Sequence, residues 1–346
     1  MSSRIPRIAE RTNILVVGGA GFLGSHLCEF LLEKHNVICV DTYFSGKEQN
    51  IDHLLVNPHF EFIRHDIREP LDFKLFKGLE RFRVAHIGVQ HIYYLAGSVS
   101  PTVYLKHPVD VSMTCSAGTR NILDLAVEWR ARLLFLSNAV LYGTVTEGPI
   151  SEDQGGELDW RSPEEWYPSA LRFGESLVEM YRATYSLETK IVRLFQTYGP
   201  RMHFDDGRFI PELIRAHLHN EEIVIDERFV KASCLYISDA VDALEKIMLT
   251  EKGAVYNLGS PTSYSIDELI AAVARLTGSE PRVRRALLDQ DAALRIQYAW
   301  IQHARTPNMT LLRDAAAWFP VVLLEEGLQK TIDYMKALRG IRRINS

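Results

Sequence analysis

The chain has 346 residues, 47% hydrophobic and 24% charged, with a formal net charge of -5; the length fits one large α/β domain with a smaller second lobe, and the charge disfavours nucleic acid as a partner. Its apolar runs are of strand length, far short of the roughly 20 residues that cross a bilayer, and its first residues lack the apolar stretch of a secretory signal, so we expect a cytoplasmic protein without a membrane span. The four cysteines form no Cys-x-x-Cys pair and the 12 histidines no His-Glu-x-x-His spacing, so we expect neither a disulfide framework nor a metal site.

Short β-branched or aromatic runs alternate with amphipathic stretches through the first part of the chain. The expected strands are residues 14–17, 37–40, 60–64, 91–95, 133–137 and 190–195. The stretches between them, such as 25–34, 111–130 and 170–185, repeat apolar residues at three- and four-residue spacing, which is typical of helices. This alternation predicts a Rossmann-like, doubly wound α/β fold in which helices cover a parallel sheet.

After residue 199 the alternation loosens. Residues 210–219 and 266–277 are predicted helices, and residues 223–225 and 255–258 are predicted short strands. We therefore expect a first domain over residues 1–199 and a smaller C-terminal α/β substrate lobe over residues 200–346, with segments near 232–240 returning to the first domain.

A glycine-rich turn joins the first predicted strand to a helix, in the string Gly18-Gly-Ala-Gly21-Phe-Leu-Gly24. Its glycines allow a tight turn, close approach of a pyrophosphate and close packing of helix on strand, with the phosphates at a positive helix N-terminus. Asp41 ends the next strand, where a carboxylate can accept a hydrogen bond from a ribose hydroxyl and repel a 2′-phosphate. The pattern predicts that the first domain binds NAD; the alternative is a glycine turn without a ligand.

Longer strings resemble a known family, the extended short-chain dehydrogenase/reductases of the NAD-dependent nucleotide-sugar epimerase/dehydratase kind, and within it the UDP-glucuronate decarboxylases. The matching strings begin at Gly18, Asp41, Arg64, Tyr94, Tyr198, Tyr236 and Tyr256, and the resemblance covers nearly the whole chain. It implies NAD as cofactor, a nucleotide sugar as ligand, and a homodimer built from the helices at 111–130 and 170–185.

The expected cofactor site combines the turn with residues that follow the next strands. Its members are Gly18, Gly21, Phe22, Leu23, Gly24, Asp41, Asp66, Ile67, Leu95, Ala96 and Gly97. Asp66 is expected to meet the adenine amino group, and a simple helix cap is an equally supported alternative.

The family's Tyr-x-x-x-Lys motif is altered in this chain, which reads Tyr167-Pro-Ser-Ala-Leu171. A free tyrosine has a pKa of about 10, so a neighbouring ammonium is needed to stabilise the phenolate near neutral pH. Leu171 supplies no charge, and Arg172 lies about 100° further around the helix. Tyr167 is therefore a candidate acid or base only if another cation approaches it, and otherwise a core aromatic.

A second departure follows the strand at 133–137. Where the family's decarboxylases read Ser-Thr-Ser-Glu-Val-Tyr-Gly, this chain reads Ser137-Asn-Ala-Val-Leu-Tyr-Gly143. Asn138 replaces the catalytic hydroxyl and can still donate a hydrogen bond, but it cannot relay a proton by rotating. Val140 replaces the decarboxylase glutamate, so we expect decarboxylation by the family's route to fail.

The expected substrate contacts are also changed. Gln196 replaces a family asparagine, and Lys231 lies beside the position of a family arginine that grips a diphosphate. Arg201 and Arg208 are candidate phosphate partners, with an ordinary surface or lobe-bridging role as the alternative.

Two functions remain open from the sequence. One is an enzyme on nucleotide sugars that retains NAD but uses a rebuilt proton-transfer site, with Tyr167 and Asn138 as its candidates. The other is a catalytically silent relative that binds NAD and serves as a scaffold, sensor or partner subunit.

Overall fold

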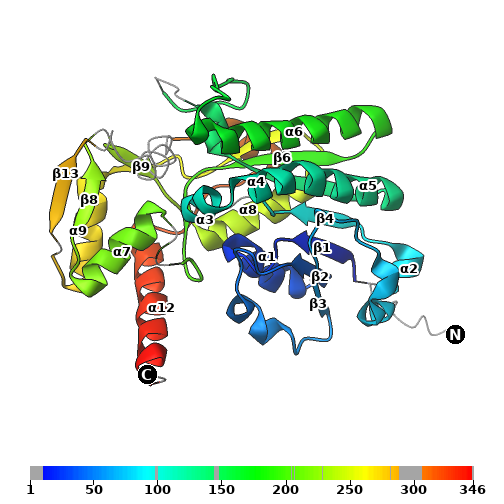
Figure 1. Cartoon of the computed structure of the whole chain (residues 1–346), viewed down its shortest axis with the longest axis horizontal. Helices are drawn as coiled ribbons and strands as arrows, with labels where there is room; N and C mark the ends of the chain where they lie inside the picture. The colour runs from blue at the N-terminus through cyan, green and yellow to red at the C-terminus, as the bar shows by residue number, and fades with distance from the viewer. Residues whose placement is uncertain are drawn as a thin grey trace, which may run out of the picture.

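A seven-stranded parallel sheet forms the larger part of the molecule in the computed structural model (Figure 1). The structure describes residues 11–97, 100–143, 148–203, 205, 207–227, 229–280, 282–287 and 306–344. In spatial order the strands are β11 (Val255–Leu258), β6 (Thr189–Leu194), β5 (Arg132–Asn138), β4 (His91–Tyr94), β1 (Asn13–Val17), β2 (Asn36–Asp41) and β3 (Phe60–Arg64). The six strands expected before residue 199 are confirmed, and so is the doubly wound parallel sheet.

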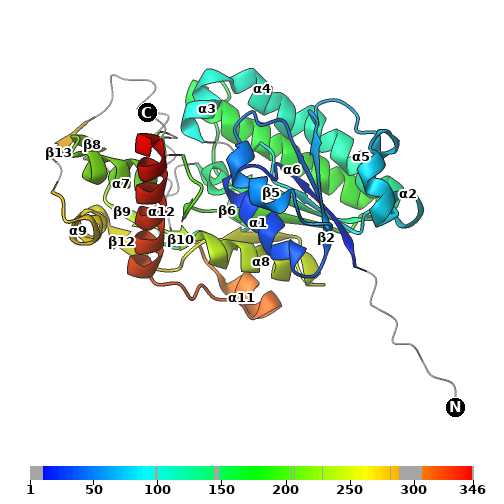
Figure 2. The same ribbon diagram turned by 90° about the horizontal axis from the view of Figure 1, so that it is seen from below.

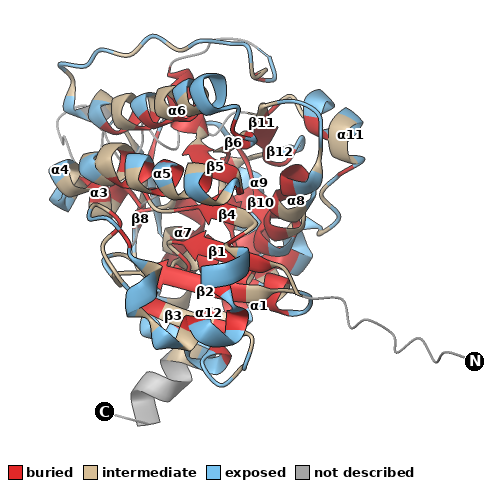
Figure 3. Cartoon of the chain, turned by 90° about the vertical axis from the view of Figure 1, so that its right-hand side faces the viewer, coloured by how far each residue is buried: buried red, intermediate tan, exposed pale blue. Residues whose placement is uncertain are grey.

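Helices cover both faces of this sheet, because each central strand alternates its side chains between two apolar layers (Figure 3). One layer holds Ile14 and Val16 and is covered by α1 (Phe22–Leu32) and α8 (Ile237–Leu249). The other holds Leu15 and Val17 and is covered by α5 (Thr119–Trp129) and α6 (Trp166–Tyr185).

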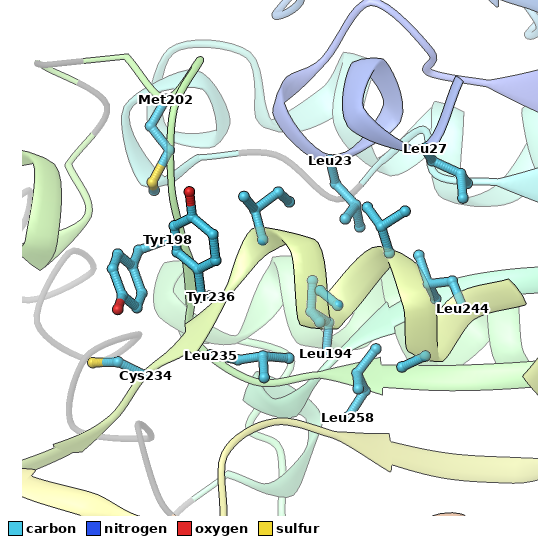
Figure 4. Packing of buried hydrophobic residues seen from close by; sticks show 14 of the residues in the cluster. Leu23, Leu27, Leu194, Tyr198, Met202, Cys234, Leu235, Tyr236, Leu244 and Leu258 are labelled. Carbon is cyan, nitrogen blue, oxygen red and sulfur yellow. The ribbon is translucent and has the colours of Figure 1, made fainter. Parts of the chain in front are cut away.

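The layer under α8 is shown in Figure 4. Leu23 and Leu27 of α1 face α8, and Leu194 and Leu258 lie on the strands beneath it. Helix α8 therefore packs against α1 at its side and against the sheet beneath it.

The expected helix at 111–130 is interrupted by a π-helical turn. Helix α4 (Pro108–Met113) continues through this turn, Thr114–Gly118, into α5. The hydroxyl of Tyr94 on β4 donates to the carbonyl of Thr114 at 2.6 Å. A side-chain donor that takes a helix carbonyl out of the regular ladder is a known cause of such a bulge.

The C-terminal lobe lies at one end of the sheet (Figures 1 and 2). Its elements are α7 (Phe209–His219), β8 (Ile223–Asp226), β9 (Lys231–Ser233), β12 (Ser263–Ser265), α9 (Ile266–Thr277) and β13 (Val283–Ala286). Strands β8 and β13 pair in parallel, and β9 and β12 pair antiparallel. The predicted helices at 210–219 and 266–277 and the predicted strand at 223–225 are confirmed.

The remaining elements connect or flank these two parts. They are α2 (Val84–Ile87), α3 (Pro101–Lys106), the paired strands β7 (Thr197–Tyr198) and β10 (Leu235–Tyr236), α11 (Thr310–Ala316) and α12 (Leu324–Ile344). None of the helices in the described ranges combines the length and apolar content that a membrane crossing requires.

One edge of the main sheet comes from a segment that the sequence assigns to the second lobe. Residues 255–258 were expected in the second lobe, but β11 is the edge strand of the main sheet and pairs with β6. The chain thus returns to the sheet well beyond the 232–240 segment. A short apolar run predicts a strand but contains no information about which strand it pairs with.

Candidate functional site

A cavity of about 510 Å³ opens at the carboxyl ends of β1, β2, β4, β5 and β6. In the sheet β1 lies between β2 and β4, so the cavity lies where the strand order reverses. This is the place where doubly wound folds bind their ligands. The expected site residues that line it are Gly18, Gly21, Phe22, Leu23, Gly24, Asp41, Asp66, Ile67, Leu95, Ala96, Gly97, Asn138 and Arg208.

The glycine turn forms one wall of the cavity and has the geometry that a pyrophosphate needs. Gly18 has φ +82°, and a Cβ at this position would lie 2.9 Å from the backbone nitrogen of Ala96. A Cβ at Gly24 would lie 2.2 Å from the carbonyl oxygen of Gly18. Side chains are therefore excluded here, and the backbone itself forms the cavity wall.

The N-terminus of α1 faces the same cavity. In the part of the chain that the structure describes, no side chain caps this helix and no acidic residue lies in its first turn. The first N–H groups of a helix have no partner within the helix, and Phe22, Leu23 and Gly24 all line the cavity. A bound phosphate would satisfy these donors and the helix dipole, so the residues present fit NAD.

Asp41 supports the turn as well as lining the cavity. Its Oδ2 accepts from the N–H of Ala20 at 2.9 Å, and its Oδ1 accepts from the N–H of Tyr43 at 2.8 Å. Burial raises the pKa of Asp41, and these backbone N–H groups oppose the shift. The carboxylate thus holds the turn in place at the point where the ribose is expected.

Asp66 stabilises a short turn and does not cap a helix, because no helix begins at this point of the chain. Its carboxylate accepts from the backbone N–H of Arg68 at 3.0 Å and from the Arg68 guanidinium at 2.7 Å. The hydrogen bond from Arg68 is the main reason why the pKa of Asp66 is lowered. Arg68 also pairs with Asp110 of α4. Contact of Asp66 with adenine stays a prediction.

Asn138 ends β5 and lines the cavity. Its Oδ1 accepts from the N–H of Val140 at 3.0 Å and so caps the 3-10 turn Ala139–Tyr142. This cap uses the amide oxygen, so the amide nitrogen is the atom with which Asn138 can donate to a ligand.

Tyr167 and Leu171 lie in an apolar layer between α6 and the α3–α4 region. Their exposed fractions are 0% and 1%, and both belong to a cluster with Tyr104 and Val140. The rings of Tyr104 and Tyr167 are 5.3 Å apart. Neither Tyr167 nor Leu171 is among the described residues that line the cavity.

Arg172, which directly follows Leu171, is engaged with the backbone. Its guanidinium donates to the carbonyls of Leu141 and Gly156, each at 2.9 Å. It therefore anchors the backbone next to the cavity instead of approaching Tyr167.

A buried polar network that the sequence did not reveal supports the segment after Asn138. Arg193 on β6 pairs with Glu175 of α6 at 2.8 Å and donates to the hydroxyl of Tyr142 at 3.0 Å. That hydroxyl donates to Asn257 on β11 at 2.6 Å. The network ties α6, β6 and β11 together beneath the Asn138 turn.

Three of the four expected substrate residues lie away from the cavity lining. Arg201 pairs with Glu29 of α1, which corresponds to the lobe-bridging alternative. Lys231 is exposed on β9, and Gln196 lies between β6 and β7. Arg208 does line the cavity, and its guanidinium carbon lies 5.4 Å from the centre of the Phe22 ring.

Several cavity residues were missed by the sequence reasoning. Among them are Phe44, Ser100, Thr102, Lys106, Thr197 and His203. They come from loops, helix ends and the short strand β7. Ser100 and His203 lie within two of the family-like strings but were given no role, and only the fold brings all six together.

Comparisons with known proteins agree with this geometry. Residues 14–259 match the NAD dependent epimerase/dehydratase family. UDP-glucuronic acid decarboxylase 1 of Xenopus tropicalis is 33% identical over 329 residues, which cover 94% of this chain and 73% of the relative. UDP-glucuronic acid decarboxylase 6 of Arabidopsis thaliana is 33% identical over 318 residues, 91% of this chain and 86% of the relative.

Solved structures share the fold. UDP-glucose 4-epimerase of Thermotoga maritima, crystallised with UDP-glucose, has a TM-score of 0.79 at 24% identity and covers 95% of this chain and 100% of its own. UDP-glucuronic acid 4-epimerase of Bacillus cereus, in complex with UDP-glucuronic acid and NAD, has a TM-score of 0.76 at 23% identity and covers 94% and 100%.

Proposed function

Because the chain belongs to the NAD-dependent epimerase/dehydratase family, we propose that it binds a nucleotide sugar beside NAD and does not move protons there with a tyrosine–lysine pair. The names of its relatives and the ligands of its structural neighbours support the ligand class. When bound, NAD supplies hydride transfer to and from a sugar carbon. Asn138 would donate its amide N–H to a sugar oxygen.

The burial of Tyr167 and Leu171 is the observation that carries this proposal. Removal from water disfavours a charged phenolate, and the side chain of Leu171 supplies no charge that would stabilise one. The family's lysine position holds a leucine that packs against Val140 and Tyr104. Any proton transfer would therefore require that Tyr167 moves into the cavity. Otherwise one of the titratable groups that line the cavity, such as His203, would have to transfer the proton.

A catalytically silent protein is the second candidate. Three changes favour it together: Asn138 in place of a hydroxyl, Val140 in place of a glutamate, and Leu171 in place of a lysine. In this case the bound NAD and nucleotide sugar would stabilise a scaffold, sensor or partner subunit and undergo no conversion.

One experiment separates the two candidates. The purified protein is mixed with NAD+ and a panel of nucleotide sugars that includes UDP-glucuronate, and binding, NADH absorbance, released carbon dioxide and sugar products are measured. Binding without conversion supports the silent protein, and a converted sugar supports altered chemistry. Rapid release of carbon dioxide from UDP-glucuronate would overturn both, and failure of every nucleotide sugar to bind would remove the ligand class.

We also propose a homodimer through residues 111–130 and 170–185. Large apolar side chains are exposed on these helices, among them Met113 at 46%, Phe173 at 48% and Met180 at 56%. Exposed apolar side chains gathered on neighbouring helices favour a protein interface. Sedimentation should give a dimer that Met180→Glu weakens; a parent chain that sediments as a monomer at micromolar concentration would contradict this.

A further inference from the structure

Helix α6 holds the turn that follows Asn138 by hydrogen bonds as well as by apolar packing. One guanidinium nitrogen of Arg172 donates to the carbonyls of Leu141 and Gly156, each at 2.9 Å. Leu141 lies within the 3-10 turn Ala139–Tyr142, and Gly156 belongs to the loop that precedes α6. Arg172 therefore connects three backbone segments, namely α6, the turn and the loop.

The loop and the turn are in direct contact at this point. A Cβ at Gly156 would lie 2.3 Å from the carbonyl carbon of Tyr142, and a Cβ at Gly143 would lie 2.8 Å from the carbonyl oxygen of Glu157. Backbone segments this close leave no space for a Cβ between them. A displacement of the loop would therefore move the turn as well, and Arg172 holds the two together.

The position of the turn determines the direction of the Asn138 amide. Its Oδ1 accepts from the N–H of Val140 at 3.0 Å, and the N–H of Gly143 donates to the carbonyl of Val140 at 3.1 Å. Leu141, whose carbonyl Arg172 binds, is the next residue of the same turn. The oxygen and nitrogen of an amide lie at a fixed angle, so binding the oxygen to the turn also fixes the direction in which the nitrogen donates.

The other arginine at this turn has a different environment. Arg193 pairs with the buried Glu175 at 2.8 Å, so its removal would leave a buried carboxylate without its partner. Arg172 is half-buried, and its bonds to Leu141 and Gly156 end on neutral carbonyls. Removal of the Arg172 guanidinium should therefore release the turn while the protein stays folded.

We propose that Arg172 is a positioning residue, which holds the turn so that the amide nitrogen of Asn138 is presented to the sugar. This inference rests on the proposed function, in which Asn138 donates to a sugar oxygen. Helix α6 then acts on the ligand through the backbone that it supports, since Tyr167 and Leu171 of the same helix lie outside the described lining of the cavity.

The test separates the sugar from the rest of the ligand. In saturating NAD+, calorimetry compares UDP-glucuronate with UDP, which lacks the sugar. Arg172→Met keeps a long side chain but removes the donors, so it should weaken UDP-glucuronate by about 3- to 10-fold and UDP by less than about twofold. In the Asn138→Asp background the same change should weaken UDP-glucuronate by less than about twofold, because the amide donor is already absent.

Arg182→Met is the matched control, because Arg182 lies on the same helix and pairs with Glu179. It removes the same charge and should leave both affinities unchanged. Arg172→Lys keeps the charge and N–H donors but not the planar fork, so its UDP-glucuronate affinity should lie between those of the parent and Arg172→Met. It is also the test variant if Arg172→Met does not fold.

A second measurement needs no ligand. Hydrogen exchange with mass spectrometry reports on the peptide that contains Val140 and Gly143, whose N–H groups are bonded at the turn. Exchange of this peptide should be at least about threefold faster in Arg172→Met than in the parent or in Arg182→Met.

Four results would overturn the proposal: unchanged UDP-glucuronate affinity in Arg172→Met, equal losses for UDP and UDP-glucuronate, the same loss in both Asn138 backgrounds, or unchanged exchange of the turn. A parent protein that binds UDP but not UDP-glucuronate would be a different failure, because it would contradict the ligand class of the proposed function. The exchange measurement would then still decide whether Arg172 holds the turn.

Discussion

The two sides of the cavity differ in how far they keep the family pattern. On the side of α1 every glycine of the turn is present, whereas the other side has Leu171, Asn138 and Val140 where the family resemblance implies a lysine, a hydroxyl and a glutamate. The turn would be needed even without a ligand, because a Cβ at Gly24 would collide with the backbone of Gly18. Leu171 fills an apolar layer, where packing requires a side chain of suitable size and shape but no particular chemical group. The turn is therefore weak evidence for activity, because the fold requires its glycines even in a protein that converts no substrate.

A substitution at Gly21 should have the largest effect on the α1 side of the cavity. This residue has φ -72°, which aspartate can adopt, and it is the N-cap of α1. In Gly21→Asp the carboxylate would accept from the helix N–H groups and repel the pyrophosphate. We expect NAD+ affinity by calorimetry to fall at least about 100-fold with the fold retained.

Gly155→Asp is the control for this change, since nothing lies within 4 Å of a Cβ at that position. It adds the same charge without touching the turn. Equal NAD+ affinities for Gly21→Asp and the parent would contradict the cofactor site.

Leu171→Lys tests the other side of the cavity. A buried ammonium without a partner should lower the free energy of unfolding by about 3 to 5 kcal/mol, whereas Leu171→Met should cost less than about 1.5 kcal/mol. Urea unfolding measures both. Unchanged stability of Leu171→Lys, above all with a new NADH signal on addition of UDP-glucuronate, would show that this layer can accept a working lysine.

Two substitutions distinguish the role of Asn138 as a cap of the 3-10 turn from its proposed role as a donor to the sugar. Asn138→Asp keeps an oxygen that accepts from the Val140 N–H but loses the amide donor. We expect UDP-glucuronate affinity to fall about tenfold while stability stays within about 0.5 kcal/mol of the parent. Asn138→Ala should also lose about 1 kcal/mol of stability, because the cap is gone. Full affinity in Asn138→Asp would exclude Asn138 as a donor.

The smallest expected effect is a pH dependence of stability that comes from His26. This residue of α1 contacts the carbonyl of Pro200, which follows β7. Burial, with a smaller contribution from Arg201, lowers the pKa of His26 from 6.5 to about 4. The unfolded chain therefore binds this proton first as the pH falls, so the stability is present above pH 6.5 and is lost between pH 6.5 and about 4. Between pH 7 and pH 5.5 the loss should be about 1 kcal/mol.

His26→Gln isolates this contribution in urea unfolding at several pH values. Other half-buried histidines, such as His91, also have a lowered pKa and add to the slope in both proteins. The parent should therefore lose more stability than the variant as the pH falls. Parallel curves would show that His26 keeps an ordinary pKa.

The sequence predicted those parts of the molecule whose signals are local. The six strands, the glycine turn and Asp41 follow from periodicity and from the spacing of a few residues. That Leu171 occupies the position where the family resemblance implies a lysine follows from the sequence alone, since the motif spans one helical turn; its effect on activity stays a prediction.

Other features depend on packing between distant segments. No local pattern shows that Tyr167 is fully buried or that Arg201 pairs with Glu29. The π-helical turn in the expected helix at 111–130 coincides with a hydroxyl from β4. The helix propensities of the residues near this turn do not indicate that Tyr94 donates to the Thr114 carbonyl.

The position of β11 limits how this protein can be divided. A chain that ends near residue 199 would lack α8 and would leave β6 as an unpaired sheet edge beside an uncovered apolar layer. Such edges are templates for aggregation. The cofactor-binding half is therefore not a transferable module, and truncations meant to isolate it should give insoluble protein.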